Sequence, residues 1–203
     1  MNTNQKTFFS ALNKISEILP AFFWVLLIFG FEEPPVALIS ITAAIIHECG
    51  HMSYIFLKKN NGKLRGNLSG FRIKSKGVFS YKDEMLTYIA GPLANLSTAL
   101  LVVLFIPLFG ETAVDTAIIH LVTAISNLLP IKGYDGYGIL RCLIQKSERA
   151  EDALIFVERF SSGLIFFFCI FSLYLIDRQG GGYWIFAVFF ASMIKNIKDG
   201  LGE

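Results

Sequence analysis

The stretch from Ala43 to Phe56, AAIIHECGHMSYIF, places two histidines and a glutamate in a run that is otherwise mostly apolar. His47 and His51 are four residues apart, so on an α-helix they lie on one face and close enough to share one cation. Imidazole is a common zinc ligand, and H-E-x-x-H on a helix is a zinc arrangement in which the glutamate is the general base. The spacing therefore predicts that His47 and His51 bind zinc and that Glu48 activates a water molecule beside them.

The opposite interpretation is that the motif is an accident and that each histidine is satisfied by a neighbouring helix. Ionisable residues within an apolar span are costly, and by default they mark a functional site that faces the protein interior. The chain has only three histidines, and two of them lie in this pentapeptide. The functional interpretation is therefore favoured, whereas Cys49 is expected to pack on another side of the helix.

A catalytic zinc site needs a third protein ligand in addition to the two histidines. The stretch from Ile125 to Leu140, ISNLLPIKGYDGYGIL, supplies the best candidate. An apolar run ends near Pro130, three glycines loosen the backbone that follows, and Asp135 lies among them. The alternative is an ordinary Asp-Gly turn at the membrane interface. Taken together with the histidine pair, the segment favours a carboxylate that approaches His47 and His51.

These two segments resemble the motifs of the site-2 protease family of intramembrane zinc metalloproteases. Members carry H-E-x-x-H on one span and N-x-x-P-x-x-x-x-D-G on a later one. HECGH matches the first motif, and Asn127, Pro130, Asp135 and Gly136 fall on the second. The stretch AGPLANLSTALL, which begins at Ala90, is also similar to the family's small-residue helix. The resemblance covers about residues 36–140.

The resemblance implies one zinc ion per chain, with Asp135 as the third metal ligand beside His47 and His51. It also implies that Asn127 is a catalytic residue that positions the substrate or stabilises the oxyanion. The expected activity is that of an intramembrane zinc endopeptidase, which cuts a membrane-tethered protein in or near a transmembrane segment. Glu48 would activate the attacking water.

Bacterial relatives of this kind carry out regulated intramembrane proteolysis or clear signal-peptide remnants. The layout looks closest to the sporulation branch that processes a sigma-factor precursor. The expected partners are the lipid bilayer, the substrate and a regulatory membrane protein, with no nucleic acid. Two alternatives are a metal-ion transporter and an inactive homologue that binds membrane helices without cutting them.

The elements that must position these residues are membrane helices. The chain has 203 residues, of which 54% are hydrophobic and 17% are charged, too apolar for an ordinary soluble domain. The sequence predicts an all-α polytopic membrane protein, with a single domain over residues 1–203 and a catalytic core over about 36–140. Six candidate spans follow: 19–31, 36–57, 85–109, 113–129, 153–176 and 183–197.

The placement of basic residues predicts the orientation of these spans. With a cytoplasmic N-terminus and alternating spans, all eight basic residues of 58–84 lie on the cytoplasmic side, whereas Arg178 is the single basic loop residue outside. This is a strong positive-inside bias. We therefore expect a multi-pass protein of the cell membrane with both termini in the cytoplasm. The three cysteines have no paired spacing, so disulfides are not expected.

Three further features concern the surroundings of the site. Gly91, Asn95 and Ala99 repeat every four residues, a small-residue pattern that lets membrane helices pack closely, and Asn95 is expected to bridge helices. His120 is expected to be a packed, hydrogen-bonded residue and not a ligand. In the basic loop, FRIKS and VFSY alternate on either side of Lys76-Gly77, which predicts a short β-hairpin.

Overall fold

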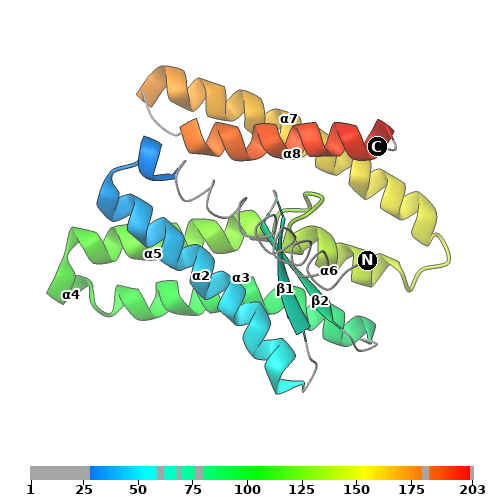
Figure 1. Ribbon diagram of the computed structural model, residues 1–203, viewed down its shortest axis with the longest axis horizontal. Helices are drawn as coiled ribbons and strands as arrows, with labels where there is room; N and C mark the ends of the chain where they lie inside the picture. The colour runs from blue at the N-terminus through cyan, green and yellow to red at the C-terminus, as the bar shows by residue number, and fades with distance from the viewer. Residues whose placement is uncertain (1–27, 59–61, 68–69, 76–79, 180–182, 202–203) are drawn as a thin grey trace, which may run out of the picture.

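The computed structural model describes residues 28–58, 62–67, 70–75, 80–179 and 183–201. Most of these residues are helical (Figure 1). The helices are α2 (Pro34–Leu57), α3 (Tyr81–Val103), α4 (Ile106–Phe109), α5 (Glu111–Asn127), α6 (Asp135–Ile144), α7 (Ala150–Gln179) and α8 (Tyr183–Leu201).

Three described helices, α2, α3 and α7, are long and apolar enough to cross a membrane. Their outward faces carry large apolar side chains such as Ile45, Leu100 and Phe166, each more than half exposed. Such continuous apolar surface needs an apolar surrounding, which indicates association with a membrane. Six spans are not confirmed, since α5 has only 17 residues and most of the predicted span 19–31 lies outside the described residues.

The predicted span over 85–109 corresponds to an apolar helix with different bounds, Tyr81–Val103. Helix α3 ends at Val103, and a separate short helix α4 begins at Ile106 with Pro107 in its first turn. Proline lacks the backbone N–H that a continuing helix needs. Gly110 then takes a positive φ of 55° and leads directly into α5.

Two strands, β1 (Gly62–Asn67) and β2 (Gly70–Ser75), pair antiparallel between α2 and α3, with Leu64 opposite Ile73. The predicted pairing of FRIKS with VFSY is wrong, because FRIKS pairs with the segment before it. Ser80 instead caps α3, since its side chain accepts a hydrogen bond from the Asp83 N–H, and Tyr81 is already helical. The residues between β2 and Ser80 lie outside the described part of the chain.

Helix α3 packs against α2, α5 and α6. Its buried residues include Gly91, Asn95 and Ala99, the repeat predicted to form a close-packing face. The approach of α2 to α3 is close enough that a Cβ on Gly50 would lie 2.5 Å from the Ala90 carbonyl oxygen. Small residues on both helices therefore bring the histidine-bearing helix directly onto α3.

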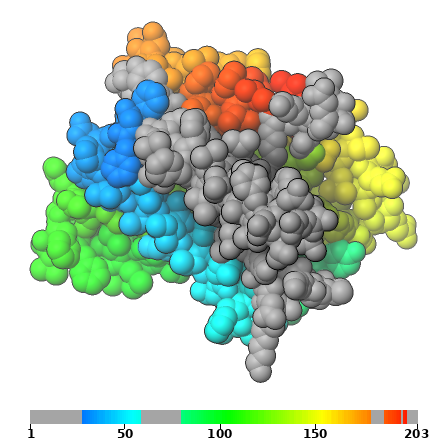
Figure 2. All heavy atoms as spheres, viewed as in Figure 1, coloured from blue at the N-terminus to red at the C-terminus, as the bar shows by residue number. Residues whose placement is uncertain are grey.

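Helices α7 and α8 pack side by side as a second group (Figure 1). In the space-filling view, the orange end of α7 and the red α8 lie along the top, whereas the green atoms of α4 and its neighbours lie at the lower left (Figure 2). The segment that leads from α5 to α6 packs on this second group, because Ile131 is fully buried against Ile165, Cys169 and Phe189. The chain just before Asp135 is therefore anchored on α7 and α8, whereas the two histidines belong to the α2–α3 group.

Candidate metal centre

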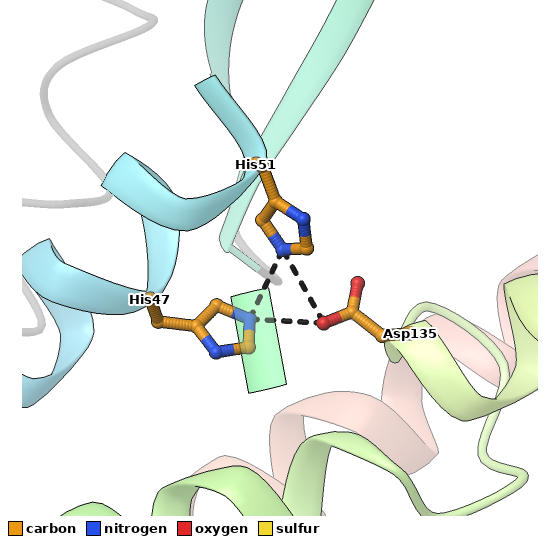
Figure 3. Close-up of side chains that lie close together, drawn as sticks. All are labelled: His47, His51 and Asp135. Carbon is orange, nitrogen blue, oxygen red and sulfur yellow. Dashed lines mark hydrogen bonds and ion pairs between the residues drawn. The ribbon is translucent and has the colours of Figure 1, made fainter. Parts of the chain in front are cut away.

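His47, His51 and Asp135 converge at one point (Figure 3). The histidines lie on the buried face of α2 and are 5% and 6% exposed. Asp135 is the first residue of α6. Its Oδ2 lies 2.9 Å from His47 Nε2 and 3.3 Å from His51 Nε2, and the two ring nitrogens are 3.1 Å apart.

These three distances suit a tetrahedral metal site. Zinc bonds to imidazole nitrogen and carboxylate oxygen are about 2.0–2.1 Å long, which places tetrahedral ligand atoms roughly 3.3–3.4 Å from one another. The observed separations lie at or slightly below that value, so the three side chains need only small shifts to hold one ion. The three residues thus fit zinc in both donor chemistry and spacing.

The hydrogen bonding of Asp135 supports the same conclusion. Its Oδ2 lies close to both ring nitrogens, yet this buried oxygen has no well-directed hydrogen bond among the described residues. Both the short distances and the missing hydrogen bond are explained if Asp135 Oδ2 and the two histidine Nε2 atoms direct their lone pairs at one shared centre. A buried carboxylate oxygen is costly without a partner, and a cation would supply one.

A backbone contact orients His51. Its Nδ1 lies 2.7 Å from the carbonyl oxygen of Thr87 on α3. A carbonyl can only accept, so Nδ1 must donate its proton, and a neutral ring then carries its lone pair on Nε2. This tautomer presents Nε2 to a metal, and such outer partners are typical of metal-binding histidines.

Polar contacts at the ends of α2 and α3 hold Thr87 in place. The Tyr54 hydroxyl donates to Asp83 Oδ1 over 2.9 Å, and Lys58 Nζ lies 3.0 Å from the same oxygen. The hydrogen bond to Asp83 raises the pKa of Lys58 above its ordinary value. These contacts fix the first turns of α3 against the last turns of α2, one turn before Thr87.

Glu48 lies next to His47 on α2 and is not among the residues that could hold a metal. Its carboxylate interacts electrostatically with His51 and Asp135, and its buried Oε2 has no hydrogen-bond partner among the described residues. An acceptor oxygen in this position is suited to take a proton from a water molecule at the centre.

Asp135 owes its position to the turn before it and to α7. Gly133 has a φ of 102°, a conformation that favours glycine, and the Lys132 N–H donates to the fully buried Ser161 of α7 over 2.7 Å. The sequence placed Asp135 within loosened backbone, but that irregular segment ends at Tyr134 and Asp135 begins a helix. The N-terminal end of a helix also favours a carboxylate.

Glycines allow the close approach of the elements that carry the ligands. A Cβ on Gly136 would meet the backbone of Leu128 and Leu129, and a Cβ on Gly91 would meet both histidine rings. Neither position has room for a side chain. The second motif's Gly136 is thus explained by packing between α6 and the end of α5.

The remaining site predictions have different outcomes. Asn127 is the last residue of α5, and its amide donates to the Thr123 carbonyl of its own helix over 2.9 Å, so its role in catalysis stays a prediction. His120 is buried and hydrogen-bonded, as expected, with its Nδ1 3.0 Å from Asn95 Oδ1. The three cysteines are free, and Cys49 is exposed.

The chain was compared with protein families, curated sequences and solved structures. No protein-family model and no curated protein sequence matches the chain. Among solved structures, the chain is similar to the site-2 protease from Methanocaldococcus jannaschii, with a TM-score of 0.63 and 17% identity. The match covers 91% of this chain and 87% of that chain.

The chain has the fold of a site-2 protease. The predicted resemblance is therefore confirmed at the level of the fold, and the His47, His51 and Asp135 cluster fits an H-E-x-x-H zinc site. At 17% identity the likeness concerns the fold alone. The chemistry must be argued from the residues of this chain.

Proposed function

We propose that this protein is an intramembrane zinc endopeptidase that hydrolyses a peptide bond in or near a transmembrane segment of a membrane-tethered protein. The observation that carries the proposal is the convergence of His47, His51 and Asp135 from α2 and α6, with Glu48 beside them. The site-2 protease fold and the apolar helices that surround this site support it.

The chain's own residues divide the chemistry among them. His47 and His51 offer neutral ring nitrogens, and Asp135 offers a negative charge that lowers the cost of holding a dication. When bound, zinc would supply Lewis acidity, which makes a water molecule acidic near neutral pH and polarises a carbonyl. Glu48 would take a proton from the water molecule while the water oxygen bonds to the scissile carbonyl carbon. Glu48 would then return a proton to the amide nitrogen as the C–N bond breaks.

Asn127 would stabilise the developing oxyanion through its side-chain amide. That amide donates to the Thr123 carbonyl, so the side chain would have to turn away from its own helix to serve the substrate. Asn127→Asp, which keeps the size but removes the donors, should therefore lower kcat more than it raises KM.

The proposed membrane orientation places both termini in the cytoplasm, as the distribution of basic residues indicates. His47 and His51 lie in the second half of α2, the half that leads into the basic loop. Cleavage would then occur near the cytoplasmic side and release a soluble fragment there. The proposed partners are the bilayer, the embedded substrate and a membrane protein that regulates access.

The experiment compares wild type with Glu48→Gln, purified in detergent, for zinc per chain and for cleavage of a single-span protein substrate. Removal of a general base typically lowers the rate about 10²–10⁴-fold, whereas the three ligands are untouched. Both proteins should hold one zinc, and only wild type should cut at a measurable rate. Glu33→Gln, at the exposed start of the same helix, is the matched control and should cut like wild type.

Other results would reject the proposal in distinct ways. Equal cleavage by wild type and Glu48→Gln would show that Glu48 is not the base. Zinc-dependent ion flux in vesicles without cleavage of any of a panel of tethered substrates would favour a transporter. Zinc binding and substrate binding without either activity would favour an inactive homologue.

A further inference from the structure

A buried chain of polar side chains lies behind His47, on the opposite side of its ring from Asp135. Asn95 of α3 and His120 of α5 are 0% and 1% exposed. The Asn95 amide nitrogen lies 3.4 Å from His47 Nδ1, and the Asn95 amide oxygen lies 3.0 Å from His120 Nδ1. Three helices thus each contribute one residue to a single line of contacts that ends at the metal centre.

Which ring nitrogen of His47 carries the proton decides whether Nε2 can bind a metal. A neutral imidazole has one N–H and one lone pair. Nε2 faces Asp135 and His51, so metal binding requires the lone pair on Nε2 and the proton on Nδ1. That Nδ1 proton needs an acceptor, and Asn95 is the side chain in contact with it.

The two ends of the Asn95 amide have opposite effects on His47. With the nitrogen end toward His47, the amide donates to Nδ1, which leaves the ring proton on Nε2 and opposes metal binding. With the oxygen end toward His47, the amide accepts the Nδ1 proton and frees the Nε2 lone pair. Half a turn of the amide about its Cβ–Cγ bond exchanges these two states without moving any other heavy atom.

We propose that Asn95 and His120 act together as positioning residues that select the metal-binding tautomer of His47. Asn95 Oδ1 accepts the proton of His47 Nδ1, and Asn95 Nδ2 donates to His120 Nδ1. In the structure the amide oxygen, not the nitrogen, faces His120 Nδ1, so the proposed state is reached by the half turn of the amide. A His120 ring with its proton on Nε2 then accepts from the amide nitrogen and holds the oxygen end toward His47. The inference rests on the proposed function only in that His47 is a zinc ligand.

His51 provides the natural comparison. Its Nδ1 contacts the Thr87 backbone carbonyl, which can only accept, so its tautomer is fixed by the main chain. His47 has an amide in the equivalent place, which can either donate or accept, and a second partner must decide. The chain's third histidine, His120, is the buried residue in contact with the other end of that amide.

The experiment measures the zinc dissociation constant by competition with a chelator, which does not depend on proteolysis. Asn95→Leu keeps the approximate shape but removes both hydrogen bonds, and it should weaken zinc binding by about 10–100-fold, as expected for loss of an outer partner of a metal ligand. Asn95→Asp offers an acceptor oxygen at either end and should bind zinc as tightly as wild type or more tightly. Ser172→Ala removes another buried hydroxyl, far along α7, and is the control for loss of a buried polar group.

A double-mutant cycle distinguishes tautomer selection from simple packing. In the wild-type background, His120→Leu should weaken zinc binding, because the amide loses the partner that orients it. In the Asn95→Asp background the same change should have little effect, because both ends of a carboxylate accept. If Asn95→Leu does not fold, the double-mutant cycle still tests the proposal, because it uses only Asn95→Asp and His120→Leu.

Two results would overturn the proposal. One is a wild-type zinc affinity in folded Asn95→Leu. The other is an equal loss from His120→Leu in both backgrounds, which would indicate packing alone. In either case, a wild type that holds zinc and cuts substrate would leave the proposed function intact.

Discussion

Gly91→Ala places a methyl group beside the two metal-binding nitrogens. The new Cβ would lie 2.8 Å from His47 Nε2 and closer still to His51 Nε2, whereas ordinary contact begins at 3.4 Å. The Cβ would therefore lie 0.6 Å too close to His47 Nε2, the difference between 3.4 Å and 2.8 Å. This exceeds the roughly 0.2 Å tolerance of a zinc–ligand bond, so at least one ring must leave its binding position.

The expected loss of zinc affinity follows from the binding free energy that one ligand contributes. Zinc binding by small protein sites is worth about 10–16 kcal/mol, which gives roughly 3–5 kcal/mol for each of three or four ligands. Loss of about 3 kcal/mol weakens binding by roughly 100-fold. Alanine is favoured over glycine within a helix by about 0.5–1 kcal/mol, so α3 itself should not be destabilised by its backbone.

The assay is zinc affinity by chelator competition, with circular dichroism to confirm the helical fold. The control is Gly163→Ala in α7, where an added Cβ meets nothing within 4 Å. We expect Gly91→Ala to bind zinc at least about 100-fold more weakly and Gly163→Ala to bind it normally. Normal zinc affinity in Gly91→Ala would refute the placement of α3 against the two rings.

Three further predictions concern the segment that carries Asp135. Gly136→Ala should reduce the bound zinc per chain and lower Tm, because the added Cβ meets rigid backbone and must displace the first turn of α6. Ser161→Ala leaves the Lys132 N–H without its buried partner, so stability should fall by about 1–3 kcal/mol and zinc affinity should fall with it, measured by denaturation and chelator competition. Glu158→Gln removes an ion pair with Lys132 that is about half exposed, and should change Tm and zinc affinity little.

Each of these three predictions has a contradicting result. A Gly136→Ala protein with a full zinc complement would mean that α6 can move away from α5 without cost to the site. A larger effect from Glu158→Gln than from Ser161→Ala would mean that the exposed ion pair, and not the buried hydroxyl, anchors the segment. Ser53→Ala, an exposed hydroxyl that bonds within α2, serves as the neutral control.

The metal cluster could be predicted because its pattern is local. Two histidines four residues apart share a helix face whatever surrounds that helix. Asp135 was harder, since a turn dipeptide is common, and it was singled out only together with the histidine pair and the second motif of the resembled family. The contribution of Ser161 could not be predicted, because nothing in a serine on α7 indicates which backbone group it meets.

Some features of the fold could not be predicted from the sequence for similar reasons. Hydrophobic runs indicated the long helices, but apolar character alone did not show the break between α3 and α4, where Pro107 lies in the first turn of α4, or the break between α4 and α5 at Gly110. Alternation in FRIKS indicated a strand without indicating its partner, because the segments on both sides contain residues compatible with pairing. The contact between Asn95 and His120 joins α3 to α5, and only a buried polar pair in two apolar helices pointed toward it.

The most direct test of the metal centre is zinc X-ray absorption of the purified protein. We expect one zinc per chain, with nitrogen and oxygen ligands at about 2.0–2.1 Å and the outer scattering of two imidazole rings. In Asp135→Asn the imidazole signal should remain while affinity falls. A chain that binds no zinc, or a zinc with sulfur at about 2.3 Å from its free cysteines, would contradict the proposed centre.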